Sequence, residues 1–350
     1  MERLRSAILG CGGFARRHAQ VITQLPHELE ITAFADRNLW KAQALADEFT
    51  GGHARCYTDH HALLEQEQLD VLIICLPPYG HTDEVERAAD RGVHILIEKP
   101  IALDAAHAWR MVRAADRAGI RTQVGFMNRF GAAVEALKER IDSGTAGNAG
   151  LFTARYFCNA LHAPWWREQE KSGGQLVEQA IHLFDVMRYL MGDPTHVFSH
   201  QTNFFHRDVE GYTAEDTSAT VMRFENGAIG AVQATNGAIP GRWLSEFQVV
   251  CSRVTADFQS HSHATFHDTR DPGTPPRVVE AHDDVIMKQT LDLVRAIRTG
   301  SDTRTPLVEG ARTLELVLAA RESSRTGREV QLGRGAGAAP PHQGTNPGTP

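Results

Sequence analysis

The sequence predicts an α/β protein with two domains: a doubly wound parallel sheet at the N-terminal end, followed by an α+β domain with a mostly antiparallel, open sheet. A chain of 350 residues is long enough to bury two cores. Its first third alternates short β-rich runs with amphipathic stretches, as successive βαβ units do. Later, alternating runs flank the turn signal Asn226-Gly227, which is typical of a hairpin.

The first domain is expected at 1–126, with five strands and four helices. Apolar runs bounded by turn residues predict the strands at 5–9, 30–35, 71–76, 94–98 and 122–126. Amphipathic stretches between them predict helices at 14–25, 39–49, 83–91 and 105–118. Ligands of such sheets bind beyond the carboxyl ends of the strands, so residues directly after strands are the candidates for a site.

The second domain is expected at 127–332, as one antiparallel sheet with helices on one face. Helical patterns cover 132–141, 176–191, 284–298 and 309–325. A strand is expected at 151–157, and the hairpin strands at 218–225 and 228–234. A tail at 333–350 has too few large apolar residues to form a core, so it is expected to be disordered.

The composition is that of a soluble globular protein, with 42% hydrophobic and 23% charged residues. A net charge of −7 without a basic stripe makes nucleic acid an unexpected partner. The longest apolar run, 71–78, is much shorter than the roughly 20 residues needed to cross a bilayer, so no membrane association is expected. Five cysteines without a C-x-x-C pair argue against a disulfide framework and favour the cytoplasm.

A glycine-rich turn follows the first expected strand and opens the first expected helix. Gly10, Gly12 and Ala15 match the pattern G-x-G-x-x-G/A, with Gly13 and Phe14 between them. The first glycine permits a tight turn, the second lets the backbone approach a pyrophosphate, and the alanine lets the helix pack against the strand. The amides at the helix N-terminus then face the phosphates. The turn predicts a dinucleotide-binding Rossmann domain.

An acidic residue, Asp36, ends the second expected strand. A carboxylate at this position accepts hydrogen bonds from the ribose hydroxyls and repels a 2′-phosphate, so it favours NAD over NADP. The neighbouring Arg37 leaves NADP as the lesser alternative, because a guanidinium can stack on adenine or pair with a phosphate. NAD is therefore the expected cofactor.

Lys99 is the first candidate for the chemistry. It follows Glu98 and precedes Pro100 at the carboxyl end of an expected strand, where the nicotinamide half of the cofactor should lie. A lysine there can polarise a hydroxyl or carbonyl oxygen. The alternative is an ordinary solvated lysine after a strand.

A second candidate group lies on the 176–191 helix. Four-residue spacing places Glu178 and His182 on one face, and Asp185 follows one turn later. A carboxylate beside an imidazole orients the ring and favours its protonated form, which suits a general base. A helix-stabilising pair and a carboxylate-histidine metal site remain as alternatives.

Taken in order, these motifs make the chain resemble the Gfo/Idh/MocA oxidoreductases, a family that includes glucose-fructose oxidoreductase and inositol dehydrogenase. The resemblance covers about residues 6–332. It rests on the glycine turn, Asp36, Cys75-Leu76-Pro77-Pro78 with His81, Glu98-Lys99-Pro100, Gly125-Phe126 with Arg129, and the helix that carries His182 and Asp185.

The resemblance implies an α/β domain after the Rossmann domain, whose open sheet often serves oligomerisation, so a homodimer or homotetramer through the C-terminal sheet is expected. It assigns contact with cofactor and substrate to Lys99, an often cis peptide bond to Pro100, and catalysis to His182. The other implied contacts fall on Cys75, Pro77, His81 and Glu98 for the cofactor and on Arg129 for the substrate.

One position departs from the family pattern. The family commonly has aspartate four residues before the catalytic histidine, whereas this chain has Glu178. The charge is kept, but the longer arm can reach the substrate differently or point away. Glu178 is expected to contribute to catalysis and substrate binding, with less support than Lys99 and His182.

Further substrate contacts are expected from Trp165, Trp166 and Arg167, which precede the helix where similar proteins line the sugar pocket. Aromatic faces suit the C–H surfaces of a pyranose, and a guanidinium suits its hydroxyls. The alternative is that the tryptophans pack in the core.

No metal site is expected. Three histidines in a polar stretch, His261, His263 and His267, are interpreted as solvated loop residues because no carboxylate arrangement completes a site. His60-His61 is interpreted as a helix start.

The expected function is NAD-dependent transfer of hydride between nicotinamide and a secondary hydroxyl of a sugar, sugar derivative or cyclitol. Lys99 would polarise the oxygen and His182 would take its proton. Two alternatives stay open, since the family also contains NAD-dependent glycoside hydrolases and a non-catalytic regulator.

Overall fold

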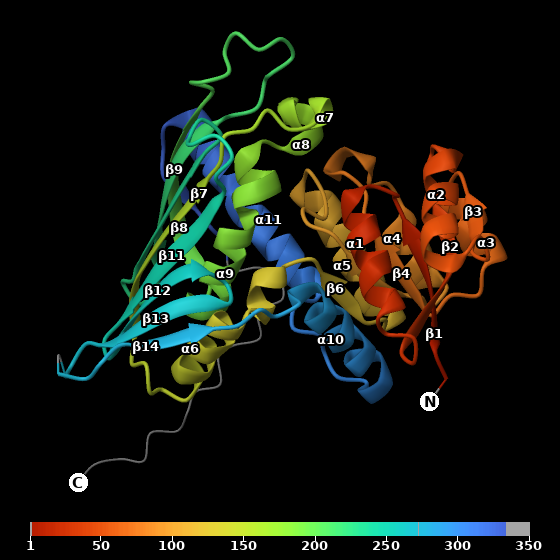
Figure 1. Cartoon of the computed structure of the whole chain (residues 1–350). Helices are drawn as coiled ribbons and strands as arrows, with labels where there is room; N and C mark the ends of the chain where they lie inside the picture. Colours follow the sequence, from red (N-terminus) through yellow and green to blue (C-terminus); the bar gives the residue numbers. More distant parts are fainter. Residues whose placement is uncertain (1, 272, 334–350) are drawn as a thin grey trace.

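The computed structural model describes residues 2–271 and 273–333, which form two sheets with helices between them (Figure 1). The first sheet has the order β3-β2-β1-β4-β5-β6, and all its strands are parallel, which is the Rossmann arrangement. The predicted doubly wound sheet is confirmed. Its strands are β1 (Leu4–Leu9), β2 (Leu29–Ala35), β3 (Arg55–Tyr57), β4 (Val71–Ile74), β5 (His94–Ile97) and β6 (Thr122–Val124).

The four predicted helices of this domain, α1, α2, α4 and α5, agree with the sequence to within about two residues, whereas α3 was predicted only as a helix start at His60-His61. Asp104 caps α5 by accepting a hydrogen bond from His107 N, and Gly119 ends the same helix in the left-handed conformation. The sequence patterns missed β3, because its three residues carry no apolar run. The helical segments are α1 (Gly13–Thr23), α2 (Leu39–Thr50), α3 (His60–Gln66), η1 (Pro78–Gly80), α4 (Glu84–Asp90), α5 (Ala105–Ala118) and η2 (Met127–Phe130).

The second sheet has the order β14-β13-β12-β11-β7-β10-β9-β8-β15. Every pair in it is antiparallel except β7 with β10, so the expected mostly antiparallel sheet is confirmed. The hairpin around Asn226-Gly227 joins β9 to β10. Its strands are β7 (Ala149–Phe157), β8 (Pro194–Thr202), β9 (Thr217–Phe224), β10 (Ile229–Thr235), β11 (Leu244–Cys251), β12 (Val254–Ser260), β13 (His263–Asp268), β14 (Arg277–Glu280) and β15 (Val330–Gln331).

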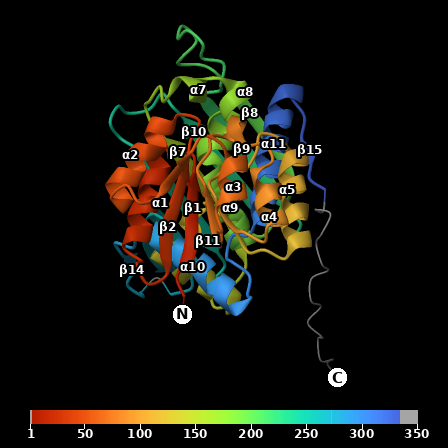
Figure 2. The same ribbon diagram turned by 90° about the vertical axis from the view of Figure 1, so that its right-hand side faces the viewer.

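Helices α6, α9 and α11 cover the face of this sheet that is turned toward the first domain, and no described helix covers the other face (Figure 1). Figure 2 shows the first domain in front of the second sheet. The expected layer of helices on one face is therefore confirmed. Among the described helices, none is long and apolar enough to cross a membrane. The helical segments are α6 (Ala132–Asp142), α7 (Pro164–Arg167), α8 (Gln169–Ser172), η3 (Leu176–Ala180), α9 (Ile181–Met191), α10 (Val285–Thr299) and α11 (Leu307–Thr326).

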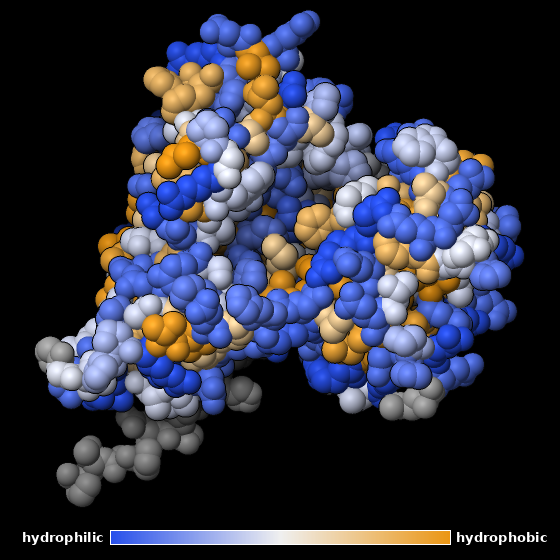
Figure 3. Space-filling model, viewed as in Figure 1, coloured by the Kyte–Doolittle hydropathy of each residue, from blue (hydrophilic) through white to orange (hydrophobic). Residues whose placement is uncertain are grey.

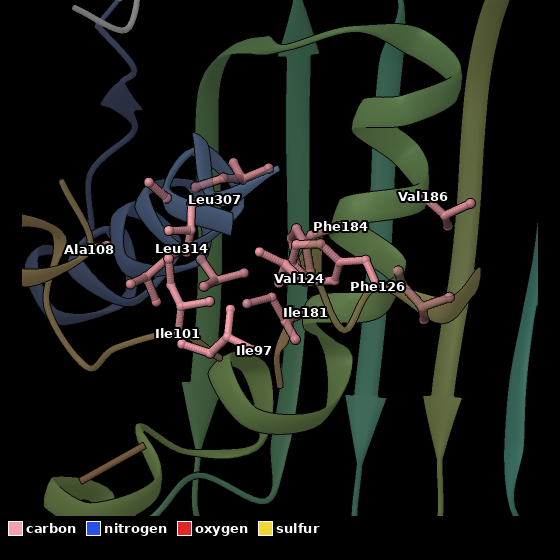
Figure 4. Packing of buried hydrophobic residues seen from close by; sticks show 14 of the residues in the cluster. Ile97, Ile101, Ala108, Val124, Phe126, Ile181, Phe184, Val186, Leu307 and Leu314 are labelled. Carbon is pink, nitrogen blue, oxygen red and sulfur yellow. The ribbon is translucent and has the colours of Figure 1, made fainter. Parts of the chain in front are cut away.

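A continuous apolar core joins the two domains. Ile97 and Val124 of the first sheet belong to the same buried cluster as Phe184 of α9 and Leu314 of α11 (Figure 4). Gly310 lets α11 approach, because a Cβ there would come within 3.0 Å of Val124. Burying each large side chain contributes about 1.5–3 kcal/mol, so the shared core fixes the two walls of the space between the domains.

The C-terminal helices return to the first domain. Leu293 and Val294 of α10 pack with Ile8 and Val71 of the first sheet. The boundary between 126 and 127 therefore stays a prediction, since part of the later chain completes the first core. The tail expected at 333–350 lies outside the described residues except for Gly333.

Candidate functional site

A cleft of about 950 Å³ lies between the carboxyl ends of the first sheet and the second domain. Figure 3 shows the surface hollowed between the two domains. Twelve of the sequence-predicted site residues line this cleft, and they come from both domains. They are Gly10, Gly12, Gly13, Phe14, Asp36, Arg37, Cys75, Pro77, Glu98, Lys99, Trp165 and Glu178.

The glycine turn has the geometry that its pattern predicts. Gly10 has a φ of +88°, and a Cβ there would come 2.6 Å from the carbonyl oxygen of Cys75. A Cβ on Gly12 or Gly13 would meet nothing within 4 Å, so the backbone at the start of α1 is open toward the cleft. Ala15 is fully buried. These features fit a dinucleotide pyrophosphate at the helix N-terminus.

Asp36 follows β2 and is held by the backbone around it. Its Oδ2 accepts a hydrogen bond from Cys11 N and its Oδ1 accepts one from Asn38 N, each at 2.9 Å. Carboxylate oxygens have further lone pairs, so the ribose hydroxyls can still donate to them. Arg37 is exposed at the same end of the cleft.

Two buried pairs flank the nicotinamide end. His18 Nε2 donates to Glu98 Oε1 at 2.8 Å, and Gly125 leaves room for that carboxylate, since a Cβ there would collide with it. His81 Nδ1 donates to Glu84 Oε1 at 2.6 Å. Burial alone would raise the pKa of Glu84, but the hydrogen bond and charge of His81 lower it to about 2. His81 does not line the cleft.

Lys99 reaches across the cleft to Glu178. The Lys99 Nζ donates to the Glu178 carbonyl oxygen at 2.7 Å and to Glu178 Oε1 at 3.0 Å. Trp166 Nε1 donates to the other carboxylate oxygen, Glu178 Oε2, at 2.7 Å. The peptide bond between Lys99 and Pro100 is cis, as the family resemblance implies.

The expected pairing of Glu178 with His182 is wrong. The carboxylate of Glu178 contacts Lys99 and Trp166, and the Nδ1 of His182 has no hydrogen-bond partner among the described residues. Burial, the charge of Lys99 and that of His261 hold the pKa of His182 well below its usual range. The imidazole is therefore neutral near pH 7, whereas the sequence argument favoured its protonated form.

The backbone at the start of the helix that carries His182 explains why Glu178 and His182 do not pair. Gly173 and Gly174 have φ values of +81° and +92°, and a Cβ on Gly174 would collide with the Glu215 carboxylate. Glu215 Oε1 accepts a hydrogen bond from Leu176 N at 2.7 Å. The turn that follows, η3, is π-helical rather than α-helical, so the four-residue spacing no longer keeps Glu178 and His182 in line. Local patterns do not identify such a turn, which depends on a distant buried carboxylate.

Arg129, a predicted substrate contact, has a structural role instead. Its Nη2 donates to Asp185 Oδ1 at 2.6 Å and to Glu309 Oε2 at 2.8 Å, and its Nε donates to Asp185 Oδ2 at 2.9 Å. Only 4% of its side chain is exposed. A guanidinium enclosed by two carboxylates of its own chain is not available to a substrate.

The segment Trp165 to Arg167 divides into three different roles. Trp165 lines the cleft, and its ring lies 6.0 Å from the ring of Tyr79, which the sequence analysis did not single out. Trp166 is 3% exposed and packs with Tyr212, so the alternative of a core tryptophan holds for it. The Arg167 guanidinium donates to the carbonyl oxygens of residues 161 and 162 and does not line the cleft.

The interpretation of His261, His263 and His267 as loop residues is wrong for two of the three. His263 and His267 lie on β13, and His261 lies in the turn before it, where burial lowers its pKa. Within the described chain, they do not form a group that could hold a metal ion.

Two family models match the chain. The model described as the oxidoreductase family with an NAD-binding Rossmann fold matches residues 4–126, and the Gfo/Idh/MocA C-terminal domain matches residues 134–257. Scyllo-inositol 2-dehydrogenase (NAD(+)) of Bacillus subtilis is 27% identical over 95% of this chain and 97% of that protein. D-apiose dehydrogenase of Paraburkholderia graminis is 28% identical over 95% of this chain and 90% of that protein.

Solved structures show the same fold. A levoglucosan dehydrogenase in complex with NADH has a TM-score of 0.86 and 21% identity over 94% of this chain and 99% of that chain. An oxidoreductase domain protein from Kribbella flavida also has a TM-score of 0.86, at 24% identity over 95% of this chain and 99% of that chain. With both of its domains matched in order, the chain belongs to the Gfo/Idh/MocA oxidoreductase family.

Proposed function

We propose that this protein is an NAD-dependent dehydrogenase that oxidises a secondary hydroxyl of a neutral sugar or cyclitol. The observation that carries the proposal is the placement of Lys99, which follows β5 inside the cleft and contacts Glu178 of the other domain. Relatives over nearly the whole chain are named as inositol and apiose dehydrogenases.

The cofactor end of the cleft fits NAD. The open backbone at Gly12 and Gly13 suits the pyrophosphate, and Asp36 suits the adenosine ribose. When bound, the nicotinamide ring accepts the hydride from the substrate carbon. Lys99 and Glu98, which line the cleft at the end of β5, would then lie beside the ring.

Lys99 holds the substrate oxygen in this proposal. An ammonium group has three donors, and Glu178 takes two of them, through its carbonyl oxygen and its carboxylate. The third is left for a hydroxyl that becomes a carbonyl. The two contacts fix the direction of the third, so the lysine is positioned before the substrate binds.

His182 accepts the hydroxyl proton. Its lowered pKa keeps it neutral near pH 7, which is the state a base requires. Its buried Nδ1 lacks a partner among the described residues, and an unsatisfied buried nitrogen is costly. His182 does not itself line the cleft, so a water molecule would carry the proton from the substrate hydroxyl to the ring.

The substrate is proposed to be uncharged, because the arginines expected around it are occupied elsewhere. Arg129 is enclosed by Asp185 and Glu309, and Arg167 binds backbone carbonyl oxygens. Lys99 is already opposite the carboxylate of Glu178. A sugar phosphate or sugar acid would bring a second anion beside Glu178, where neither Arg129 nor Arg167 is free to balance it.

The oligomeric state and the cellular location are also part of the proposal. The open face of the second sheet exposes Val221, Ile229 and Val278, each by about half, which supports a homodimer or homotetramer through this sheet. All five cysteines are free, which supports a cytoplasmic location.

The test is a panel of cyclitols, aldoses and their phosphates and uronic acids, followed by NADH absorbance. We expect turnover of a neutral member with NAD, and a loss of about 10²–10⁴-fold in kcat for Lys99→Ala and His182→Ala. Lys138→Ala, which removes a partly buried lysine paired with Asp142 outside the cleft, serves as the control. Full activity of both site variants on an identified substrate would exclude these roles.

A further inference from the structure

Three side chains with metal-binding atoms meet at the outer edge of the cofactor cleft. His60 and His61 open α3, and Asp83 directly precedes α4. The Nε2 atoms of the histidines lie 2.7 Å and 3.5 Å from Asp83 Oδ1, and the three candidate ligand atoms are all within 4.8 Å of one another. We propose that His60, His61 and Asp83 bind one zinc-class divalent cation.

Two of the three distances between the ligand atoms are close to those of a tetrahedral site. Zinc binds imidazole nitrogen and carboxylate oxygen at roughly 2.0–2.2 Å, so ligand atoms on one tetrahedron lie roughly 3.3 Å apart. The distances from Asp83 Oδ1 to the two imidazoles, 2.7 Å and 3.5 Å, are on either side of that value. A shift of about half an ångström brings these two distances to it, and the two imidazole nitrogens, which lie within 4.8 Å of each other, move together as the cation binds.

The ligand types select the class of metal. Two imidazoles and one carboxylate suit zinc and its neighbours among the transition metals, whereas magnesium and calcium prefer oxygen ligands throughout. Three protein ligands leave one tetrahedral position for water or another donor. The side chains of His61 and Asp83 are 43% and 44% exposed, so that position is open to solvent.

Arg87 acts as an outer partner of the site. Its Nε donates to Asp83 Oδ2 at 2.5 Å, which leaves Oδ1 to face the histidines. Burial alone would raise the pKa of Asp83, but the hydrogen bonds from Arg87 and His60 lower it to about 2, so the carboxylate is ionised near pH 7. Arg87 orients the carboxylate of Asp83, but its positive charge repels the cation. We therefore expect a dissociation constant of about micromolar order for zinc.

The site is next to the cofactor but distinct from its phosphate cradle. His60 lines the cleft together with Thr58 and Asp59, at the end that contains Asp36. A cation held there joins the start of α3 to the start of α4, two helices that already contact each other. Metal binding is therefore expected to raise the unfolding temperature without turnover of any substrate.

Calorimetric titration of the metal-stripped full chain with zinc chloride near neutral pH tests the proposal. We expect one site of about micromolar affinity that His61→Ala weakens at least tenfold, with no comparable site for magnesium chloride. The control is His267→Ala, because His267 Nε2 lies 3.4 Å from Asp257 Oδ2 and, among residues 2–271 and 273–333, no third ligand joins that pair.

Circular dichroism establishes that both variants are folded. The proposal is overturned if zinc binds the wild type and His61→Ala with the same affinity, or if the wild type shows only the weak binding of scattered surface histidines. Since the titration measures binding without turnover, its result is independent of the proposed dehydrogenase activity.

Discussion

Replacing Arg129 by alanine distinguishes a structural arginine from a substrate-binding one. The wild-type guanidinium is 4% exposed and donates three hydrogen bonds to Asp185 and Glu309, and it lies 4.8 Å from the centre of the Tyr189 ring. Asp185 itself is fully buried. Burial raises the pKa of Asp185, and the charge of Arg129 opposes that rise, so removing the arginine leaves a carboxyl with little support.

The expected loss of unfolding free energy in Arg129→Ala follows from the burial of this ion pair. Removing one partner of a buried ion pair costs about 3–5 kcal/mol of unfolding free energy. The value should lie near the lower end, because Arg188 and Thr313 remain beside Asp185. Arg155→Ala is the control, since its ion pair with Glu246 is exposed and such pairs contribute about 0–1 kcal/mol.

Urea unfolding and steady-state kinetics of the same variants provide the assay. We expect Arg129→Ala to shift the unfolding curve strongly, and the KM of the folded fraction to change less than tenfold. A variant with wild-type stability and a KM raised tenfold or more would refute the structural role and restore the role predicted from the sequence.

Three further predictions concern the pH response and the cofactor. The apparent pKa of the acid limb in the pH profile of kcat/KM should lie below 6.5, the usual pKa of histidine, because His182 has a lowered pKa and acts as a neutral base. An apparent pKa above 6.5 would contradict this role. Asp36→Ala should lower the ratio of kcat/KM for NAD to that for NADP by about tenfold or more, since the repulsion of a 2′-phosphate is lost; an unchanged ratio would remove Asp36 from cofactor selection. Burial raises the pKa of Glu215 to about 7, so the folded chain keeps a proton that the unfolded chain releases above pH 4.5. The free energy of unfolding of the wild type should therefore fall by about 3 kcal/mol as the pH rises from 4.5 to about 7. Glu215→Gln should lose that slope in urea unfolding at about pH 5 and about pH 8, while an unchanged slope would assign it to other groups.

The features of the fold that depend on residues close together in the sequence could be predicted. The turn at Gly10 and Gly12 depends on residues within a few positions, and so does the hairpin at Asn226-Gly227. Strands β1, β2, β4, β5 and β6 have buried apolar runs, and each lies within a few residues of its prediction. The residues directly after β1, β2, β4 and β5 therefore line the cleft as expected, whereas His81 and Arg129 do not.

The features that depend on contacts between residues far apart in the sequence could not be predicted. Glu215, 39 residues after Leu176, shapes the turn before His182. Glu309, 180 residues after Arg129, helps to enclose that arginine. Motif spacing carries no information about such pairs, and for that reason the side-chain roles were less accurate than the backbone positions.

The most direct test of the central claim is the balance between substrate oxidised and NADH formed, measured with a neutral polyol deuterated at its carbinol carbon. Oxidation through the site built on Lys99 and His182 predicts one deuterated NADH for each keto product, from the neutral polyol and not from its phosphate. Product release without net NADH, or tight NAD binding without any reduction across the panel, would contradict the claim.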